Sequence, residues 1–150
     1  MQNRPIIAVI DGLGGGIGCQ LCTRIRQAFG QRVEILALGT NSTATEKMIK
    51  AGADRGASGE NAIRVSIRSA QVVLGPIGVV LPNSLMGEIT PRMAQSIMRA
   101  RSKKIFLPVG QTHFALAGVS PVPLSKLIEE AVGLLAAELD ESLANKPEKQ

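Results

Sequence analysis

Residues 5–18 read PIIAVIDGLGGGIG, a short apolar segment that runs into five glycines within seven positions. Isoleucine and valine dominate residues 6–10, which predicts a buried strand. The glycines after it predict a tight turn, and residues 16–29 then predict a helix. The apolar face of that helix is expected to consist of Ile17, Leu21, Ile25 and Ala28. A strand, a glycine turn and a helix in this order direct the amides of the helix N-terminus toward an anion, typically a phosphate.

The spacing of the glycines limits which fingerprint they match. Gly12, Gly16 and Gly18 are spaced G-x-x-x-G-x-G, whereas the common dinucleotide fingerprint G-x-G-x-x-G is absent. A glycine suits the tight turn, the approach of a phosphate to the backbone, and close packing of the helix on the sheet. We expect phosphate or dinucleotide binding here, against the alternative of a turn that binds nothing. The expected binding residues of this loop are Asp11, Gly12, Gly14, Gly15, Gly16, Ile17 and Gly18.

The rest of the chain alternates between strand and helix patterns with short connections. Further strands are predicted at residues 33–38, 71–74 and 104–109, and further helices at 43–51, 59–70, 91–101 and from Pro123 onward. The segment 59–70 also shows strand-like alternation, but Ser58 can cap a helix there. The alternation predicts an α/β fold: a three-layer, Rossmann-like, doubly wound and mostly parallel sheet of about five strands. Residues 1–143 are expected to form this single nucleotide-binding domain, and 144–150 a polar tail.

Ligands of doubly wound sheets bind beyond the carboxyl ends of the strands, so the loops that follow the strands are the informative ones. They are residues 11–18, 39–45, 75–78 and 110–113. Besides the glycine loop, the expected binding residues are Gly39, Thr40, Asn41, Ser42, Gly75, Pro76 and Ile77. An NAD site often has Asp or Glu after its second strand, where this chain has Thr40 and Asn41. The cofactor expectation is therefore NADP or NAD, with a lean toward NADP, although Ser42 or Thr43 could also be only a helix cap.

Charge is distributed unevenly along the 150 residues. The whole chain has 17 Lys and Arg against 12 Asp and Glu, but residues 127–150 are acidic and the body is basic. A basic body suits a phosphorylated ligand. The densest basic group, Arg99, Arg101, Lys103 and Lys104, is interpreted as surface charge. The chain has no Tyr or Trp and only three Phe, so few aromatic side chains can stack on bases. A nucleic-acid partner is therefore not expected.

The chain shows no pattern of membrane insertion or export. The apolar run 6–10 is too short for a signal peptide, and the uncharged segment 70–87 is interrupted by glycine and proline. Two cysteines and no export signal favour a cytoplasmic location, and no membrane partner is expected.

Three polar features have both a structural and a chemical interpretation. Asp11 is expected to accept hydrogen bonds from the loop amides, the alternatives being a Mg²⁺ ligand or a general base. Cys19 and Cys22 have the C-x-x-C spacing of redox dithiols but are interpreted as packing residues. His113, the only histidine, could transfer protons at the crevice, although no catalytic set can be recognised around it.

Five motifs together resemble an uncharacterised family of short bacterial proteins, a domain of unknown function. They are DGLGGGIG at 11–18, ALGTN at 37–41, GASGENAI at 56–63, LGPIG at 74–78 and GEITP at 87–91. The resemblance implies no reaction. Gly12, Gly16, Ile17 and Gly18 also resemble the cofactor fingerprint of short-chain dehydrogenases. Those enzymes use a Tyr-x-x-x-Lys pair, and because this chain has no tyrosine, the resemblance does not extend to their chemistry.

Three functions are compatible with these patterns. The first is a small protein that binds NAD(P) or a related phosphorylated nucleotide at the glycine loop, and the second is a non-catalytic nucleotide sensor or accessory subunit. The third is a flavodoxin-like module for FMN or a corrinoid, although Leu13 stands where a corrinoid motif has histidine. A homodimer is also expected, because Leu134 and Leu143 widen the apolar surface of the last helix.

Overall fold

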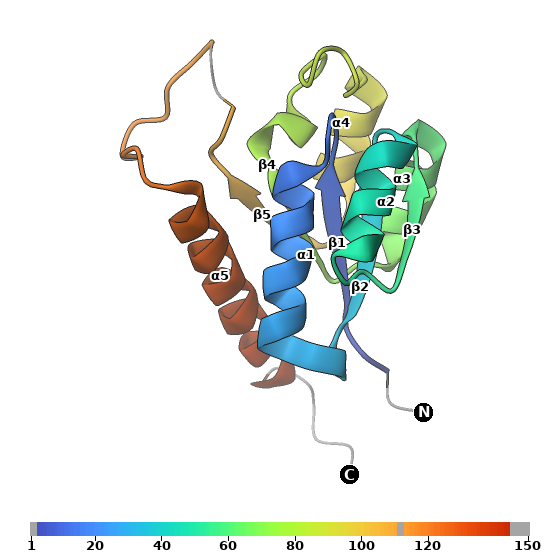
Figure 1. Cartoon of the computed structure of the whole chain (residues 1–150), viewed down its shortest axis with the longest axis vertical. Coiled ribbons are helices and arrows are strands. Elements are labelled where there is room, and N and C mark those ends of the chain that lie inside the picture. The colour runs from blue at the N-terminus through green and yellow to red at the C-terminus, as the bar shows by residue number, and fades with distance from the viewer. Residues whose placement is uncertain (1–2, 111–112, 145–150) are drawn as a thin grey trace.

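The fold is built on five parallel strands. The computed structural model describes residues 3–110 and 113–144. The strands are β1 (Ile6–Asp11), β2 (Glu34–Gly39), β3 (Arg55–Ser58), β4 (Val72–Pro76) and β5 (Lys103–Leu107). They lie in the order β3-β2-β1-β4-β5, and every neighbouring pair is parallel (Figure 1). The order reverses between β1 and β4, which is therefore the switch point at which ligands of such sheets bind.

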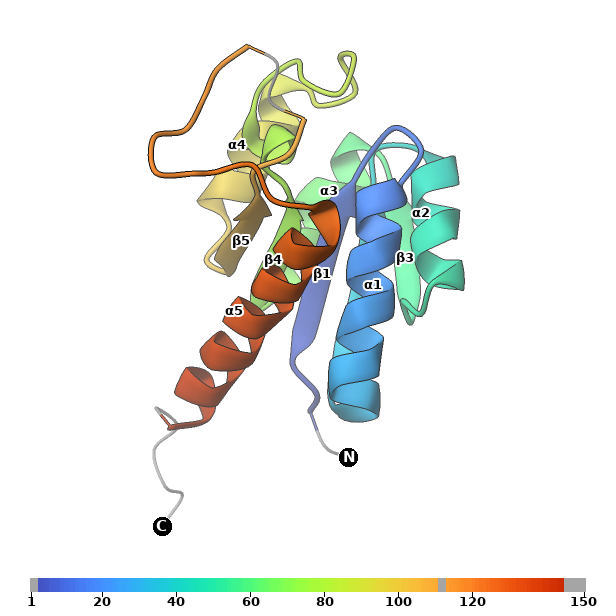
Figure 2. The same cartoon turned by 60° about the vertical axis from the view of Figure 1, so that its left-hand side comes forward.

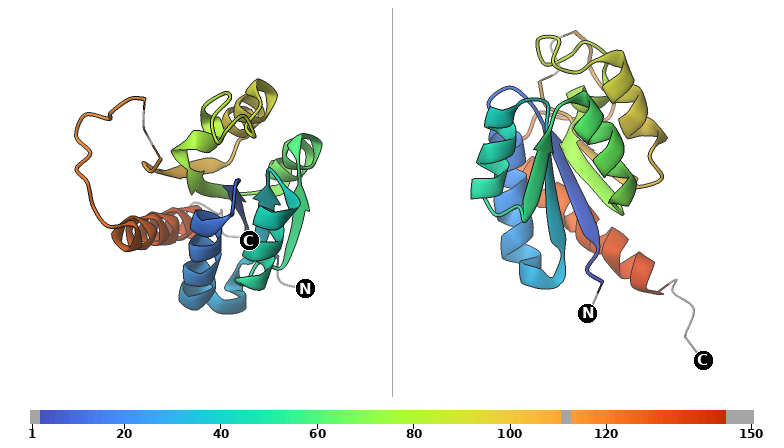
Figure 3. Two further views of the ribbon diagram at one scale, coloured as in Figure 1. Left: turned by 45° about the horizontal axis from the view of Figure 1, so that its top comes forward. Right: turned by 90° about the vertical axis from the view of Figure 1, so that its right-hand side faces the viewer.

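Helices cover both faces of the sheet. They are α1 (Gly16–Phe29), α2 (Ser42–Lys50), α3 (Glu60–Ser66), α4 (Pro91–Arg99) and α5 (Leu124–Ala144). Short 3-10 turns occupy Gly30–Arg32, Ile67–Ser69 and Ile77–Val80. Helices α1, α2 and α5 lie on one face, and α3 and α4 lie on the other (Figures 2 and 3). The three-layer, doubly wound α/β architecture expected from the sequence is confirmed, and the sheet is fully rather than mostly parallel.

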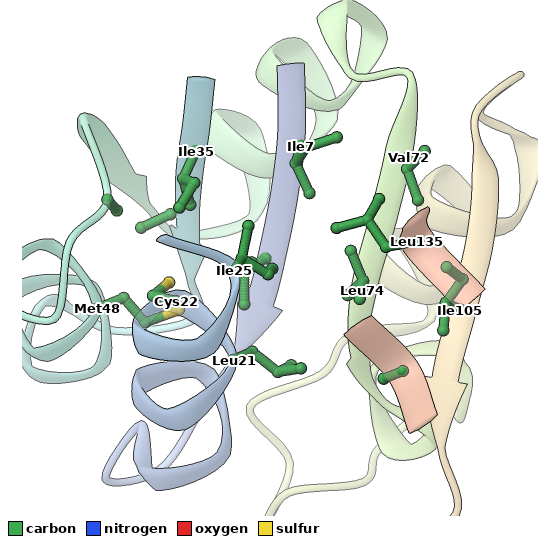
Figure 4. Close-up of a cluster of buried hydrophobic side chains, with 14 of the residues drawn as sticks. Ile7, Leu21, Cys22, Ile25, Ile35, Met48, Val72, Leu74, Ile105 and Leu135 are labelled. Atoms are coloured by element: carbon green, nitrogen blue, oxygen red, sulfur yellow. The ribbon is translucent and has the colours of Figure 1, made fainter. Parts of the chain in front are cut away.

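Two apolar cores hold these layers together. Because successive strand residues point to opposite faces, Ile7 and Val9 of β1 contribute to one core and Ala8 and Ile10 to the other. The core under α1 also contains Leu21, Cys22 and Ile25, and Leu135 of α5 joins it (Figure 4). Strands that are buried on both faces explain the nearly continuous apolar composition of residues 6–10.

Helix α1 has the predicted bounds, but its inner face differs in one residue. Ala28 is exposed, and Phe29 packs against the core instead. The buried residues Gly18, Leu21, Cys22 and Ile25 follow the i, i+3, i+4, i+7 pattern, and Phe29 continues it one turn later. The last helix, predicted from Pro123 onward, begins at Leu124 and buries Ile128, Ala131 and Leu135 in the same core.

Two local predictions between β2 and β4 were wrong. Residues 55–58 form a strand that the sequence analysis did not include, because RGAS carries no β-branched or aromatic residue. The residue that caps α3 is Gly59 rather than Ser58, and it makes no side-chain cap bond. The Ser58 hydroxyl is instead 2.7 Å from Oγ1 of Thr45, so it ties the end of β3 to α2.

The chain beyond β5 runs through an extended segment before α5. Residues 113–123 are exposed, and α5 then returns along the face covered by α1. None of the helices in the described ranges is both long and apolar enough to cross a membrane. The predicted polar tail lies outside the described residues, apart from Ala144, the last residue of α5.

Candidate functional site

The glycine loop joins β1 to α1 at the switch point, and three of its glycines are required by close contacts. Gly15 precedes α1 with φ 74°, and an added Cβ would lie 2.8 Å from Cα of Ala44. A Cβ at Gly12 would lie 2.6 Å from Oγ1 of Thr40, and one at Gly18 would meet Met48. These positions cannot accept a side chain without displacing the backbone or the buried neighbours.

Gly14 and Gly16 have no such constraint. An added Cβ at either position would meet no atom within 4 Å. The packing of helix on sheet that the sequence analysis assigned to the glycines therefore depends on Gly18, not Gly16. Both Gly14 and Gly16 line a pocket at the carboxyl ends of the strands, so no side chain at these two positions keeps a ligand from the backbone.

Asp11 stabilises the loop from within. Its side chain lies at the end of β1 and is 4% exposed. One carboxylate oxygen accepts a hydrogen bond of 2.8 Å from the Gly12 amide, and the other accepts one of 2.7 Å from the Gly18 amide. Burial raises the pKa of Asp11 above its ordinary value of 3.8, although these amides act in the opposite direction. The geometry therefore corresponds to the structural role expected for this residue.

The carboxylate of Asp11 uses only some of the amides at the N-terminus of α1. The Gly18 amide donates to Asp11, and the Cys19 amide donates to the Gly15 carbonyl. Within the described ranges, the amides of Gly14 and Gly16 have no acceptor. Unpaired amides at a helix N-terminus carry partial positive charge and attract anions.

A pocket of about 340 Å³ opens beside these amides. It extends over the carboxyl ends of β1, β4 and β5. Its lining consists of residues 11–17, residues 76–78, Leu81, Ser84, Leu85, Val109, Gly110, His113 and Phe114. Of the three site residues predicted after β4, Pro76 and Ile77 belong to this lining. Gly75, which precedes Pro76 in β4, is buried and does not line the pocket.

The loop after β2 does not line the pocket, and Glu88 connects this loop to the glycine loop by hydrogen bonds. One oxygen of Glu88 accepts hydrogen bonds from Oγ1 of Thr40, from Nδ2 of Asn41 at 3.0 Å and from the Leu13 amide at 2.8 Å. The carboxylate thus connects the ends of β1 and β2 to the loop before α4. Four predicted site residues lie in or next to the loop after β2 and do not line the pocket: Gly39, Thr40, Asn41 and Ser42.

Asn41 also begins α2. Its side-chain oxygen accepts a hydrogen bond of 2.8 Å from the Ala44 amide, so the cap is Asn41 rather than Ser42 or Thr43. An extended Asn at this position is among the strongest helix caps. Both polar groups of its amide are thereby used inside the protein.

The hydrogen bonds to Glu88 determine its charge state. Partial burial acts to raise its pKa, but the bonds from Thr40, the Leu13 amide and Asn41 outweigh this and hold the pKa of Glu88 below its ordinary value of 4.5. The loop that carries Glu88 contains Leu85 and Met86 at φ 53° and 57°, backbone values unusual for these residues. The contacts of Glu88 and the packing of Leu85 hold this loop in place.

We expect Glu88→Ala to lower the free energy of unfolding by about 1–3 kcal/mol, because three donors lose their acceptor. Glu88→Gln keeps an acceptor and is expected to cost less. Since the folded state lowers this pKa, the contribution of the charge is fully present above pH 4.5 and is lost as the pH falls below it. Urea unfolding of both variants between pH 3 and pH 7 measures this. An equal deficit of Glu88→Gln at all pH values would contradict the assignment.

The cysteines and the histidine have different environments. Cys22 is fully buried in the core, and burial raises its pKa to about 12, so its thiol is not a nucleophile at neutral pH. The described residues contain no group of three or more side chains able to hold a metal. His113 is exposed at the rim of the pocket, beside Phe114.

The loop before α4 is a part of the site that was not predicted from the sequence. Leu81, Ser84 and Leu85 of this loop line the pocket. Glu88 of the same loop accepts a hydrogen bond from Thr40 at the end of β2. A sequence signal existed, because Glu88 belongs to the GEITP motif at 87–91, which ends where the helix at 91–101 is predicted to begin. Thr90 and Pro91 in it do begin α4, and the Thr90 hydroxyl accepts from the Met93 amide at 3.1 Å.

The strand order and the glycine turn at the switch point define a Rossmann-like, doubly wound α/β protein. The chain belongs to DUF3842, a family described as a domain of unknown function, whose model matches residues 6–140. A universal stress protein from Archaeoglobus fulgidus is similar in structure, with a TM-score of 0.39 and 13% sequence identity. That match covers 70% of this chain and 98% of the other. No curated protein matches the chain.

Proposed function

We propose that the protein binds a phosphorylated nucleotide in the glycine-loop pocket, with a phosphate on the amides of Gly14 and Gly16. The observation that carries this proposal is that both amides lack an acceptor among the residues the structure describes, and that their α-carbons face open space in the pocket lining. Phosphate needs such close access to the backbone, and the N-terminus of α1 adds favourable electrostatics.

The shape of the pocket favours one nucleotide rather than an extended dinucleotide. Its volume of about 340 Å³ lies at the low end of the range for ligand sites. It extends from β1 toward β5, and Ile77, Leu85 and Phe114 in its lining offer apolar surface for a base and a ribose. A dinucleotide, NADP or NAD, is the second candidate, and its other half would have to displace Glu88 from Thr40 and Asn41.

Calorimetric titration with ADP, adenosine, FMN, NADH and NADPH at fixed salt tests the proposal. ADP is expected to bind at least about tenfold more tightly than adenosine, because only ADP can accept from the glycine-loop amides. Equal affinities for ADP and adenosine would show that the phosphate does not contribute to binding. An FMN affinity well above that of ADP would retain the phosphate site and identify the base as a flavin.

The choice between NADPH and NADH provides a further test. The expected preference for NADP rested on the absence of Asp or Glu directly after β2. The structure, however, brings the carboxylate of Glu88 to Thr40 from another loop. We expect the ratio of NADPH affinity to NADH affinity to rise in Glu88→Gln, since a negative charge opposes the extra phosphate. An unchanged ratio would show that the phosphorylated ribose binds elsewhere.

We also propose a symmetric homodimer through the β5 edge and α5. Within the described part of the chain, β5 is an edge strand that pairs with β4 alone, and Leu134 beside it is 59% exposed. Lys103 and Lys104 lie on the same surface as Glu138 and Glu141, so two copies related by a twofold axis could match opposite charges. The side chain of Leu143, the other leucine of this prediction, lies outside the described residues.

Sedimentation at micromolar concentration tests the dimer. The wild-type chain is expected to sediment at twice its mass of 15.8 kDa, and Leu134→Glu is expected to shift it to the monomer. A wild-type species near 15.8 kDa would contradict the dimer.

A further inference from the structure

The face of the protein that carries α3 and α4 is strongly basic. Residues 60–104 contain seven Lys and Arg but only two acidic residues, Glu60 and Glu88. Glu60 accepts a hydrogen bond from Thr90, and Glu88 accepts one from Thr40, so both lie near the carboxyl ends of the strands. At the opposite end of α3 and α4, this segment provides no carboxylate to balance its arginines.

Three of these arginines surround one pocket. It has a volume of about 240 Å³ and lies where the last turns of α3 and α4 pack together, on the far side of the sheet from α1. The lining consists of Arg64, Ile67, Arg68, Ser96, Arg99 and Ala100. Figure 3 shows α3 and α4 side by side on this face.

The three guanidinium groups have no partner among the described residues. Elsewhere in the chain, Arg26 binds Asp54 at 2.6 Å and Arg55 binds Glu34. Neither a hydrogen bond nor an ion pair of this kind is found for Arg64, Arg68 or Arg99 within the ranges the structure describes. Like charges gathered around one pocket repel each other, and a bound anion would relieve the repulsion.

Stabilisation of the helix ends does not account for all three arginines. Arg64 and Arg99 lie in the last turns of α3 and α4, where a positive charge is favourable. The carbonyl of Ala100, at the end of α4, already accepts a hydrogen bond from Lys104. Arg68 lies beyond α3, in the 3-10 turn Ile67–Ser69, and still lines the same pocket.

We propose that this arginine pocket binds a phosphoryl group, at a site separate from the glycine loop. A guanidinium presents a planar fork of donors that matches two oxygens of a phosphate. The Ser96 hydroxyl on α4 adds a neutral donor to the lining. The pocket is small enough to favour inorganic phosphate or the phosphate end of a small ester, and both share the chemistry that the arginines recognise.

Titration calorimetry with inorganic phosphate and with ribose 5-phosphate, at constant ionic strength set by chloride, tests this site. Saturable binding is expected, and Arg68→Gln or Arg99→Gln should weaken it at least about tenfold by removing a charged donor. Arg92→Gln is the matched control, because Arg92 is exposed at the other end of α4 and does not line the pocket. The ligand that binds more tightly shows whether the pocket takes its phosphoryl group from free phosphate or from a phosphate ester.

The same titrations in Gly14→Ala separate this site from the glycine loop. Binding that persists in Gly14→Ala and is lost in Arg68→Gln supports the arginine pocket, whatever the glycine loop binds. Binding that is lost in Gly14→Ala and unchanged in Arg68→Gln and Arg99→Gln would overturn it. A pocket that binds a single-stranded oligonucleotide but neither phosphate compound would overturn it as well.

Discussion

Replacing Gly75 by alanine is expected to lower the free energy of unfolding by about 3 kcal/mol. Gly75 is a buried residue near the end of β4, and an added Cβ would overlap the backbone carbonyl oxygen of Ile10 in β1. The obstacle is backbone in the centre of the sheet, so the two strands would have to separate at the switch point. The stability of the fold and the shape of the glycine-loop pocket both depend on this close contact between Gly75 and Ile10.

Urea unfolding of Gly75→Ala measures this effect, with Gly14→Ala as the matched control. The added methyl group is the same, but at Gly14 it would meet nothing within 4 Å. We therefore expect the control to unfold at nearly the wild-type urea concentration. Similar midpoints for the two variants would show that β1 and β4 are not as close as the structure places them.

The second large effect is on binding. Gly14→Ala and Gly16→Ala are each expected to weaken ADP binding at least about tenfold, because a Cβ prevents a phosphate from reaching the adjacent amide. Stability should be nearly retained in both, because an added Cβ meets no described atom within 4 Å at either position. Calorimetric titration with ADP, together with urea unfolding, separates the two quantities.

Gly133→Ala is the control for this pair. Gly133 lies in α5, away from the pocket lining, and an added Cβ there also meets no atom within 4 Å. Its expected result is greater stability with unchanged ADP affinity. If ADP binds Gly14→Ala and Gly16→Ala as tightly as it binds Gly133→Ala, the glycine loop is not the phosphate site.

The features that could be predicted from sequence are those set by neighbouring residues. The apolar run 6–10, the glycines after it and the spacing of α1 place the first strand, turn and helix within one segment of the chain. Thr90 and Pro91 likewise mark the start of α4 through local hydrogen bonding and a fixed φ. The doubly wound topology follows once such units alternate, because parallel strands need helical crossovers.

The features that escaped prediction depend on contacts between distant residues. Residues 55–58 become a strand by pairing with β2, although their side chains do not favour one. Glu88 reaches Thr40 across 48 positions of sequence and Leu13 across 75, which no local pattern encodes. This contact closes the end of β2, so the pocket extends toward β5 instead of toward Asn41.

The most direct test of the proposed phosphate site is an amide-resolved NMR titration of the ¹⁵N-labelled protein with ADP. We expect the amide signals of Gly14 and Gly16 to shift most, in a saturable manner, because a phosphate accepts hydrogen bonds from them. The amide of Gly18 should change little, since it already donates to Asp11. Saturable shifts confined to Thr40 and Asn41, with the signals of Gly14 and Gly16 unchanged, would show that the glycine loop does not bind the phosphate.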